Sequence, residues 1–342
     1  MTAIDTDILI VEDVQGAAFD EFAATMRVDY QPDLWKDRAL LFERVIRSRA
    51  LVVRNRTRVD AELLEAAPQL QVVARAGAGL DNIDVEAADL AGVVVVAARG
   101  ANAQSVAEHT LALALALARG VVDHDRTTRL GQWNRTSGVE LAGRTWGLLG
   151  AGATGRAVGR LVSCVASRVL GYDTTVEPGD PQIVDSGIEL VSLDRLLEES
   201  DVISIHVPAT AQTRNLVDAD FVRRMRRHAF LINVGRGEVV NEAALVEALR
   251  SGQIAGAALD VRATEPPSLG VLETLDNVVL TPHVAGITDE AQERVTGMLA
   301  SDLKALFDGG VAVNAVGARH RLSRVPDGAM LGKAMSGNGE NA

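Results

Sequence analysis

Hydrophobic residues recur along this chain in two alternating patterns. Short apolar runs bounded by turn-forming residues predict buried strands, and longer segments with apolar residues three or four apart predict helices. Regular alternation with short connections is typical of parallel sheets covered by helices on both faces. The predicted strands are 8–11, 51–54, 71–74, 93–97, 145–149, 169–172, 202–207, 229–234, 256–261 and 278–281, and the main predicted helices are 60–66, 84–90, 104–119, 241–251 and 288–307. We therefore expect an α/β fold.

The predicted strand 145–149 is followed by a glycine-rich turn. Gly150, Gly152 and Gly155 have the spacing G-x-G-x-x-G, and a helical pattern follows them. The backbone N–H groups at such a helix start suit a pyrophosphate. Asp173 ends the next predicted strand, where a carboxylate can bond a ribose diol and would repel a 2′-phosphate. The segment predicts NAD as the cofactor, and a structural turn without a ligand is the alternative.

The position of the glycine-rich turn indicates two domains. About a hundred residues of α/β pattern precede it, and the helix 288–307 follows the last predicted strand. We expect two doubly wound parallel-sheet domains: a Rossmann nucleotide-binding domain, 100–287, inserted into a flavodoxin-like substrate-binding domain, 1–99 and 288–317. Crossings at Gly100 and near Gly286 would form a hinge beside a cleft. Residues 318–342 lack periodicity and are expected to be a mobile tail.

Charge and composition limit the partners. The net charge of −12 argues against nucleic acid and anionic membranes as partners. The acidic N-terminus has only a short apolar run, so no signal peptide is expected. The run 111–118 is too short to span a bilayer and predicts a helix buried between domains or subunits. Cys164, the single cysteine, is expected on the buried side of the helix after the glycine-rich turn and fits a cytoplasmic location.

Three segments after the glycine-rich turn carry candidate catalytic residues. Arg236 lies in NVGRG, Glu265 in ALDVRATEPP and His283 in TPHVAG, each at or near the carboxyl end of a predicted strand. Histidine can take and return a hydroxyl proton near neutral pH. Glu265 in contact with it would favour the imidazolium, and the Arg236 guanidinium could hold a carboxylate by two bonds. Simple roles in loop structure are the alternatives for Arg236 and Glu265, and His109 is expected to be structural.

Together with ARAGAGLDNIDVEAA, ANAQSVAEHT and the glycine-rich turn, these segments resemble the D-isomer-specific 2-hydroxyacid dehydrogenase family. The resemblance covers about residues 5–316 and is greatest to D-3-phosphoglycerate dehydrogenases. It implies that Arg236, Glu265 and His283 are the catalytic set of an enzyme that transfers hydride to or from a nicotinamide cofactor. The chain length further leads us to expect no C-terminal regulatory domain, and no metal is expected.

The resemblance also implies which residues bind the two ligands. The implied cofactor-binding residues are Gly150, Gly152, Ala153, Thr154, Gly155, Asp173, His206, Val207, Pro208, Thr213, Val234, Gly235, Asp260 and Gly286. The implied substrate-binding residues are Arg54, Asn55, Arg75, Ala76, Gly77, Ala78, Asn102, Arg135, Arg236 and His283. Among them, Asp260 would bond the nicotinamide amide, and Arg135 would reach the substrate phosphate of the neighbouring subunit in a homodimer.

The arginines bear on the substrate, which we expect to be a small anionic 2-hydroxy or 2-oxo acid. Four arginines, Arg54, Arg75, Arg135 and Arg236, exceed what one carboxylate needs and predict a second anionic group, a phosphate or phosphonate. Ordinary solvated charges are the alternative. Asn55 and Arg262 depart from the phosphoglycerate dehydrogenase pattern, which leaves a phosphonate open. Two further hypotheses are a glyoxylate or hydroxypyruvate reductase, which needs no phosphate site, and a non-catalytic, corepressor-like protein that senses NAD.

Overall fold

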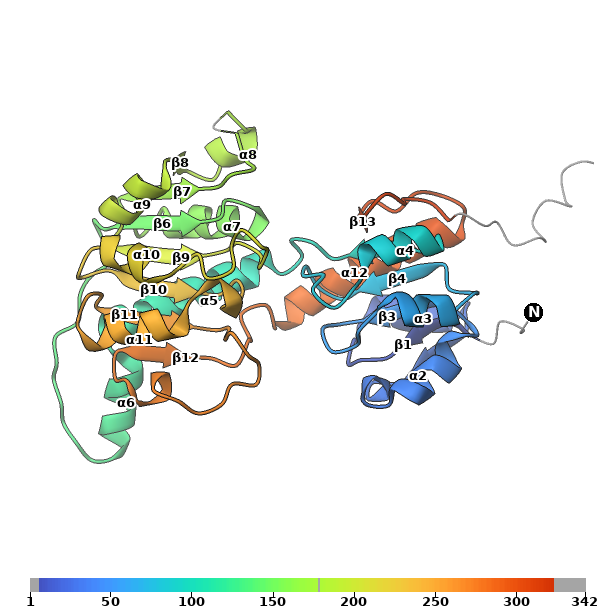
Figure 1. Cartoon of the computed structure of the whole chain (residues 1–342), viewed down its shortest axis with the longest axis horizontal. Coiled ribbons are helices and arrows are strands. Elements are labelled where there is room, and N and C mark those ends of the chain that lie inside the picture. The colour runs from blue at the N-terminus through green and yellow to red at the C-terminus, as the bar shows by residue number, and fades with distance from the viewer. Residues whose placement is uncertain (1–5, 178, 323–342) are drawn as a thin grey trace, which may run out of the picture. The chain divides into compact units, whose positions relative to one another are not determined.

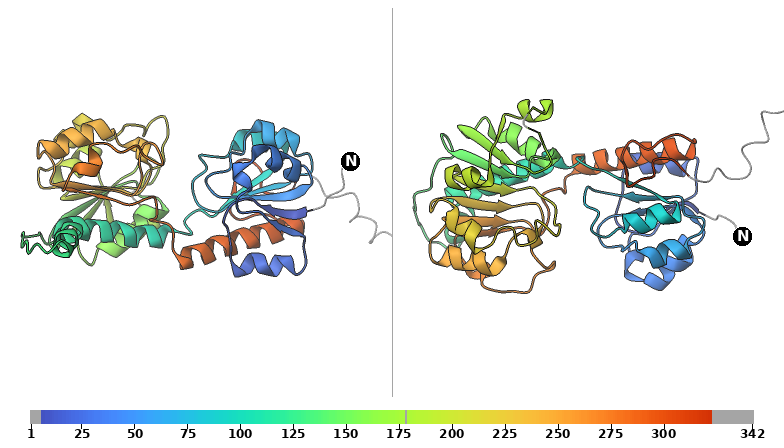
Figure 2. Two further views of the ribbon diagram at one scale, coloured as in Figure 1. Left: turned by 90° about the horizontal axis from the view of Figure 1, so that it is seen from below. Right: turned by 45° about the horizontal axis from the view of Figure 1, so that its top comes forward.

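The chain divides into two compact units in a computed structural model that describes residues 6–177 and 179–322 (Figure 1). Unit 1 comprises Met1–Ala101 and Gln292–Ala342, and unit 2 comprises Asn102–Ala291. Each unit contains one sheet with helices on both of its faces (Figure 2). The predicted α/β architecture of two doubly wound, parallel sheets is confirmed.

Unit 1 has the strand order β13-β5-β4-β3-β1-β2, which is the flavodoxin-like order with one added strand. All pairs are parallel except that of β13 with β5. Its strands are β1 (Thr6–Ile10), β2 (Val28–Tyr30), β3 (Ser48–Val53), β4 (Val72–Arg75), β5 (Val94–Ala97) and β13 (Ala315–Val316). Its helices are α1 (Ala17–Ala23), η1 (Leu34–Lys36), α2 (Arg38–Val45), α3 (Ala61–Ala66), α4 (Val85–Ala91) and most of α12 (Asp289–Phe307).

The strands of unit 1 are apolar on both faces. In β1, Ile8 and Ile10 face the core formed with α1 and α12, and Leu9 faces the core formed with α2, α3 and α4. All three side chains are almost fully buried. Successive side chains point to opposite faces of a strand, so a sheet covered on both sides produces the continuous apolar run that the sequence shows.

Unit 2 has the order β12-β11-β10-β9-β6-β7-β8, with every pair parallel. Its strands are β6 (Thr145–Leu149), β7 (Arg168–Tyr172), β8 (Ile188–Leu190), β9 (Val202–Ile205), β10 (Phe230–Asn233), β11 (Gly256–Leu259) and β12 (Val278–Leu280). Its helices are α5 (Ala103–Arg119), α6 (Val121–Arg129), α7 (Ala153–Val162), α8 (Pro181–Val184), α9 (Leu193–Glu199), α10 (Ala219–Arg224), η2 (Gly237–Val239), α11 (Glu242–Arg250) and η3 (Leu272–Thr274). The chain changes direction across the sheet between β6 and β9, and ligands bind at the carboxyl edge beside such a point.

The alternating Leu and Ala residues of 111–118 form part of α5, as expected from their helix propensity rather than their alternation. α5 packs against α7 and against β10, β11 and β12 within unit 2. No single helix in the described residues is long and apolar enough to cross a membrane; α5 and α6 together are, by length and composition only, but they bend by 62°.

One expected placement is wrong. Cys164 is exposed, and its Sγ donates to the Leu161 carbonyl at 3.0 Å. α7 ends at Val162, so the cysteine lies on the turn beyond the helix instead of on its buried side. In the segment expected to be a tail, the Ala318 N–H donates to Asp89 Oδ2 at 2.9 Å, and residues 323–342 lie outside the described residues.

Candidate functional site

The glycine-rich turn joins β6 to α7 through an unusual backbone conformation. Gly150 has φ +103°, and Gly152 is the N-cap of α7, with no side-chain cap. A Cβ on Gly155 would lie 2.1 Å from the Gly150 carbonyl oxygen, so the helix can approach the strand only without a side chain there. A Cβ on Gly150 would lie 2.9 Å from Val207. Glycine is therefore required at the first and third positions of the motif.

The start of α7 has the features of an anion site. The first bond of the helix runs from the Arg156 N–H to the Gly152 carbonyl, so the N–H groups of residues 152–155 precede it. A Cβ on Gly152 would have no atom within 4 Å, which shows open space in front of this turn. Converging N–H groups at the positive end of a helix dipole fit a pyrophosphate.

Asp173 follows β7 and is anchored to the glycine-rich turn. Its Oδ2 accepts the Ala151 N–H at 2.8 Å, and its Oδ1 accepts the Thr175 N–H and hydroxyl, each at 2.8 Å. A carboxylate has about four acceptor positions, so capacity remains for a ligand hydroxyl. The structure thus places the predicted ribose-binding acid beside the predicted pyrophosphate site.

A chain of hydrogen bonds fixes His206 after β9. The Trp146 indole N–H donates to Ser204 Oγ at 2.9 Å, and Ser204 Oγ lies 2.8 Å from His206 Nε2. The two bonds hold Ser204 Oγ between the indole and the imidazole and so fix the orientation of the His206 ring. Burial lowers the pKa of His206 to about 3, which keeps the ring neutral. Nδ1 is buried without a partner among the described residues.

The remaining predicted cofactor residues lie close to this edge. The Thr213 hydroxyl donates to the Pro208 carbonyl at 2.5 Å. A Cβ on Gly235, which follows Val234, would lie 3.1 Å from the carbonyl oxygens of Ile205 and Val207. A Cβ on Gly286 would lie 2.4 Å from the Asn102 amide nitrogen. These close approaches bring the loops after β6, β9 and β10 together, and they bring the loop after β12 to the start of α5.

His283 and Glu265 are hydrogen-bonded to each other on the loops after β12 and β11. His283 Nδ1 lies 2.7 Å from Glu265 Oε2, and the side chains are 42% and 37% exposed. His283 has φ +56°, a left-handed conformation, and its N–H donates to the Asp260 carbonyl at 2.7 Å. Because Glu265 occupies Nδ1, Nε2 is the ring atom left to exchange a proton with a substrate.

Asp260 anchors the loop that carries His283. It is 1% exposed and accepts the Thr281 hydroxyl at 2.6 Å and the N–H groups of Val284 and Ala285, each at 2.9 Å. Burial alone would raise the pKa of Asp260, but hydrogen bonds from His109, Thr281 and the two amides lower it to about 2. The resemblance assigned Asp260 only to the cofactor; its bonds here hold a loop.

His109 on α5 completes this network. Its Nε2 lies 3.1 Å from Thr281 Oγ1 and 3.5 Å from Asp260 Oδ1. The expected structural role of His109 therefore has a definite location, beneath the loop of His283. Its position on the apolar helix 104–119 was the only signal in the sequence.

Arg236 lies on the loop between β10 and η2. Its Nη1 donates to the Gly235 carbonyl at 2.9 Å, and its carbonyl accepts the amide of buried Asn233 at 2.9 Å. A Cβ on Gly237 would lie 1.9 Å from the Arg262 carbonyl carbon, so this loop touches the loop after β11. Arg236, Glu265 and His283 thus follow three adjacent strands, β10, β11 and β12.

In unit 1 a buried acid holds the loop that carries Arg54 and Asn55. Glu12, which is 2% exposed, accepts the N–H groups of residues 54, 55, 56 and 57 at 2.8, 3.2, 3.0 and 2.9 Å. On its other side, the Asn82 amide donates to the carbonyls of Arg54 at 3.2 Å and Thr57 at 2.7 Å. Neither Glu12 nor Asn82 was among the predicted site residues; the signal for Glu12 was an acid directly after the apolar run 8–11.

Arg75 and its glycine-containing loop follow β4. Arg75 is only 9% exposed, and its Nη1 donates to the Ala76 carbonyl at 3.1 Å. A Cβ on Gly77 would lie 1.7 Å from that nitrogen. The guanidinium therefore supports the loop of Ala76, Gly77 and Ala78 from beneath, and Ala78 is the exposed member of the loop.

Arg135 lies in the exposed stretch 130–140, which follows α6. Trp133 beside it is 81% exposed. Within the described part of unit 2, Arg135 has no hydrogen bond or ion pair with another predicted site residue. The structure thus does not bring Arg135 to the group of Arg236, Glu265 and His283.

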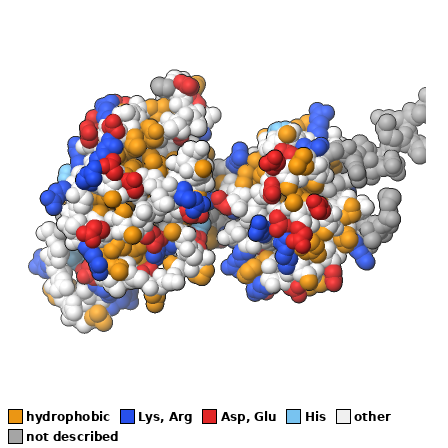
Figure 3. All heavy atoms as spheres, viewed as in Figure 1, with side chains coloured by type: hydrophobic (Ala, Val, Ile, Leu, Met, Phe, Trp, Pro, Cys, Tyr) orange, Lys and Arg blue, Asp and Glu red, His pale blue; other side chains and the backbone are white. Residues whose placement is uncertain are grey.

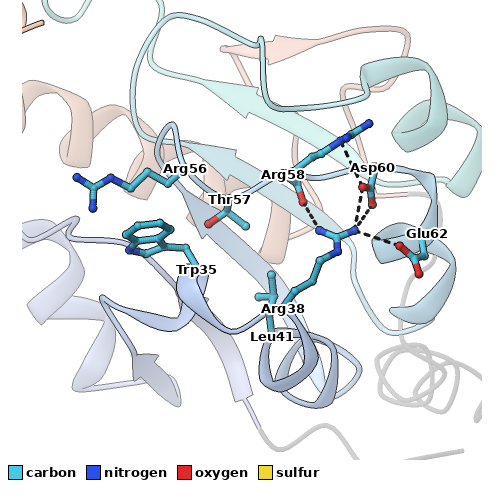
Figure 4. A pocket seen from close by; sticks show the side chains of 8 residues that line it. All are labelled: Trp35, Arg38, Leu41, Arg56, Thr57, Arg58, Asp60 and Glu62. Carbon is cyan, nitrogen blue, oxygen red and sulfur yellow. Dashed lines mark hydrogen bonds and ion pairs between the residues drawn. The ribbon is translucent and has the colours of Figure 1, made fainter. Parts of the chain in front are cut away.

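Unit 1 also has an open pocket of about 400 Å³ (Figure 4). It is lined by Trp35, Arg38, Leu41, Arg56, Thr57, Arg58, Asp60 and Glu62. Asp60 pairs with both Arg38 and Arg58, and the Arg56 guanidinium lies 4.5 Å from the centre of the Trp35 ring. Acidic and basic side chains are likewise interspersed over the visible surface (Figure 3). Because its own acids neutralise most of its arginines, we assign this pocket no anion-binding role.

Comparisons with known proteins agree with this arrangement. Residues 111–285 match the model of the D-isomer specific 2-hydroxyacid dehydrogenase, NAD binding domain. The chain is 40% identical over 312 residues to a D-3-phosphoglycerate dehydrogenase of Archaeoglobus fulgidus, which covers 90% of this chain and 59% of that protein. It is also 40% identical over 299 residues to a glyoxylate reductase of Korarchaeum cryptofilum, which covers 84% of this chain and 90% of that protein.

A solved structure shows the same fold. It is an NADPH-dependent glyoxylate/hydroxypyruvate reductase of Sinorhizobium meliloti in complex with NADP and malonate, with a TM-score of 0.82 and 29% identity. The alignment covers 94% of this chain and 99% of that one.

Proposed function

Because the chain belongs to the D-isomer-specific 2-hydroxyacid dehydrogenase family, we propose that it transfers hydride between a nicotinamide cofactor and C2 of a D-2-hydroxy acid or 2-oxo acid. The nicotinamide cofactor is supported by the matching NAD-binding domain and by the related complex with NADP. The observation that carries the proposal is the His283–Glu265 pair at 2.7 Å on loops adjacent to that of Arg236.

The residues divide the chemistry in this proposal. Bound nicotinamide would supply or accept the hydride. His283 Nε2 donates the proton to the keto oxygen during reduction and removes it during oxidation. Glu265 stabilises the imidazolium and fixes the ring through Nδ1. Arg236 holds the substrate carboxylate with its planar guanidinium. His283→Gln should lower kcat by about 10²- to 10⁴-fold with little change in NADH affinity; unchanged turnover would refute this role for His283.

We propose NAD as the preferred dinucleotide. The N–H groups of residues 152–155 would hold the pyrophosphate, and Asp173 would accept the ribose diol and repel a 2′-phosphate. His206, held by Ser204 at this edge of the sheet, would line the cofactor site. NADH should be oxidised much faster than NADPH with the same 2-oxo acid. The opposite preference would contradict the role of Asp173.

For the substrate, we propose an acid with a second anionic group, a phosphate or phosphonate. The similarity to D-3-phosphoglycerate dehydrogenases and the placement of Arg54 and Asn55 on a fixed loop support it. Arg135 would act from a partner subunit in a homodimer. The test compares turnover of 3-phosphohydroxypyruvate with that of hydroxypyruvate and glyoxylate, and includes phosphonate 2-oxo acids. Equal rates, with no loss in Arg54→Ala or Arg135→Ala, would overturn the phosphate proposal.

A reductase of glyoxylate or hydroxypyruvate is the second candidate. It is favoured by the glyoxylate reductase of Korarchaeum cryptofilum, of which this chain covers 90%, compared with 59% of the phosphoglycerate dehydrogenase of Archaeoglobus fulgidus. The same screen decides between the two. The presence of Arg236, Glu265 and His283 argues against a non-catalytic NAD sensor, which would require that His283→Ala leave the cellular role unchanged.

We further propose a homodimer in the cytoplasm. Val121, Val122, Leu130 and Trp133, on α6 and the segment after it, are 54%, 51%, 72% and 81% exposed. Several exposed apolar side chains on one segment commonly mark an interface. The exposed Cys164 thiol suits a reducing compartment. Sedimentation should show a dimer that Trp133→Ser weakens, and a monomeric wild-type protein would contradict the proposal.

A further inference from the structure

Arg262 forms a half-buried ion-pair network directly after β11. Its Nε and Nη2 donate to the two oxygens of Glu242 at 3.0 and 2.9 Å, and its Nη1 donates to Glu273 Oε1 at 2.5 Å. The Arg262 side chain is 10% exposed, and those of Glu242 and Glu273 are 28% and 18% exposed. This two-bond geometry with little solvent distinguishes the network from ordinary surface pairs.

The network fixes both ends of the loop that joins β11 to η3. Glu242 is the first residue of α11, and its Oε1 also accepts the Ala263 N–H at 3.0 Å. Glu273 lies in η3, and its Oε2 also accepts the Gly270 N–H at 2.8 Å. The residues between Arg262 and Glu273 are thereby fixed where the loop leaves β11 and where it enters η3.

Glu265 lies within this loop and has two bonds. Its Oε1 accepts the Arg262 N–H at 3.0 Å, and its Oε2 pairs with His283 Nδ1 at 2.7 Å. Glu265 and His283 are more than a third exposed, so an isolated pair there would contribute little to its own geometry. The position of Glu265 therefore depends on how its loop is held.

Charge explains why Arg262 is needed in the network. The hydrogen bond with Arg262 holds the pKa of Glu242 below its usual range, and the same is true of Glu273. Both acids are thus ionised at neutral pH. Without the guanidinium, two partly desolvated carboxylates would face each other without a cation, and the loop would open to separate them.

We propose that Arg262 is a positioning residue that holds Glu265 in place for His283. The inference rests on the proposed function, since it assigns a role in the same proton transfer. Arg262 touches neither substrate nor cofactor in this proposal and acts only through Glu265.

A double-mutant cycle tests whether Arg262 acts through Glu265. Arg262→Met should lower kcat about 10-fold, a part of what acid–base catalysis contributes, with the KM for NADH unchanged. In a Glu265→Gln background, Arg262→Met should lower kcat no further, although it should lower the thermal midpoint as it does in wild type. An equal loss of kcat in both backgrounds would overturn the proposal. Arg262→Lys should restore part of kcat.

The control is Arg195→Met. Arg195 also bridges two acids in unit 2, Glu189 and Glu199, each at 2.7 Å, but on the exposed surface and beside Arg168, which pairs with the same acids. This variant should change stability little and leave kcat unchanged. If Arg262→Met does not fold, the cycle is repeated with Glu273→Gln, which removes one of the two carboxylates that bind Arg262. This variant is then compared in the wild-type and Glu265→Gln backgrounds.

A second measurement needs no activity. In the wild-type protein without substrate, the bond to Glu265 should slow the exchange of the His283 Nδ1 proton with water in ¹⁵N-edited NMR spectra, and Arg262→Met should speed it. Unchanged exchange refutes the role of Arg262. Failure of the wild-type protein to reduce any 2-oxo acid refutes the proposed function instead and leaves the NMR test valid.

Discussion

A buried carboxylate occupies an equivalent place in each unit. Glu12 follows β1 and holds the loop after the neighbouring strand β3, and Asp260 follows β11 and holds the loop after the neighbouring strand β12. Both acids are at most 2% exposed. The first loop carries Arg54 and Asn55, and the second carries His283. In both units, the proposed ligand-binding side chains lie on loops fixed by an acid of the adjacent strand.

The two acids differ in the groups that they bind. All four groups bound to Glu12 are backbone N–H groups of consecutive residues. Asp260 binds two backbone N–H groups and the hydroxyl of Thr281, with His109 close by. Glu12 therefore fixes the backbone of its loop and places no requirement on the side chains that the loop carries. Asp260 also binds side chains. This suits a loop that must hold the His283 imidazole in place while the His283 backbone has a left-handed conformation.

The largest effect is expected from Asp260→Asn. The amide would direct N–H groups at other N–H donors, which should lower the free energy of unfolding by about 2–3 kcal/mol. Displacement of His283 should lower kcat about 100-fold. Urea denaturation and steady-state kinetics measure the two effects. An unchanged kcat would show that Asp260 does not hold His283 in its working position.

Asp201→Asn is the matched control for that variant. Asp201 is 7% exposed and accepts the Thr145 N–H at 2.8 Å, but it precedes β9, at the opposite edge of the same sheet. Asp201→Asn should lower the free energy of unfolding by a similar amount and leave kcat unchanged. A comparable loss of kcat in both variants would show that any buried acid of unit 2 matters and that Asp260 has no special role.

Glu12→Gln should have a smaller effect and a different kinetic signature. The amide opposes some of the four N–H donors, so the loop of Arg54 should loosen, and the KM for the 2-oxo acid should rise about 10-fold, equivalent to about 1.4 kcal/mol. Because His283 is untouched, kcat should change little. A fall in kcat with constant KM would contradict the distinction between the two acids.

Asp302→Asn in unit 1 is the control for Glu12→Gln. Asp302 is 2% exposed and accepts the N–H of Val313, a residue that precedes β13, at 2.8 Å. It should lose stability with an unchanged KM.

The same comparison shows what the sequence could predict. Arg236, Glu265 and His283 were found because proton transfer and carboxylate binding require those side chains, and strand ends place them at one edge of the sheet. Glu12 was missed because its partners are backbone groups more than forty residues away, which have no sequence signal. Arg262 was noted as an unusual residue, but its positioning role was missed because its partners Glu242 and Glu273 are residue types common at helix starts and turns.

The fold was predictable to a similar degree. The long apolar runs gave the central strands because a strand buried on both faces must be apolar throughout. β2, β8 and β13 were not predicted; they have three, three and two residues, lie at the sheet edges and, unlike the edge strand β12, are not part of an apolar run. The exposure of Cys164 depended on where α7 ends, and helix ends are the least certain part of a pattern.

The last effect, absent at pH 7, concerns His206 in unit 2. The pKa of His206 is lowered to about 3, whereas an imidazole in the unfolded chain titrates near 6.5. Between these values the unfolded chain binds a proton that the folded protein does not. Stability must therefore fall as the pH falls from 6.5 towards 3, by up to about 1.4 kcal/mol per pH unit from this group.

His206→Asn should flatten that slope. Urea denaturation between pH 7 and 5, followed by the fluorescence of buried Trp146 in the same hydrogen-bonded chain, measures it. His320→Asn in unit 1, at an exposed histidine, is the control variant. An equal slope in wild type and His206→Asn would mean that His206 takes up its proton while folded. In that case, unit 2 would not keep a neutral imidazole at its carboxyl edge.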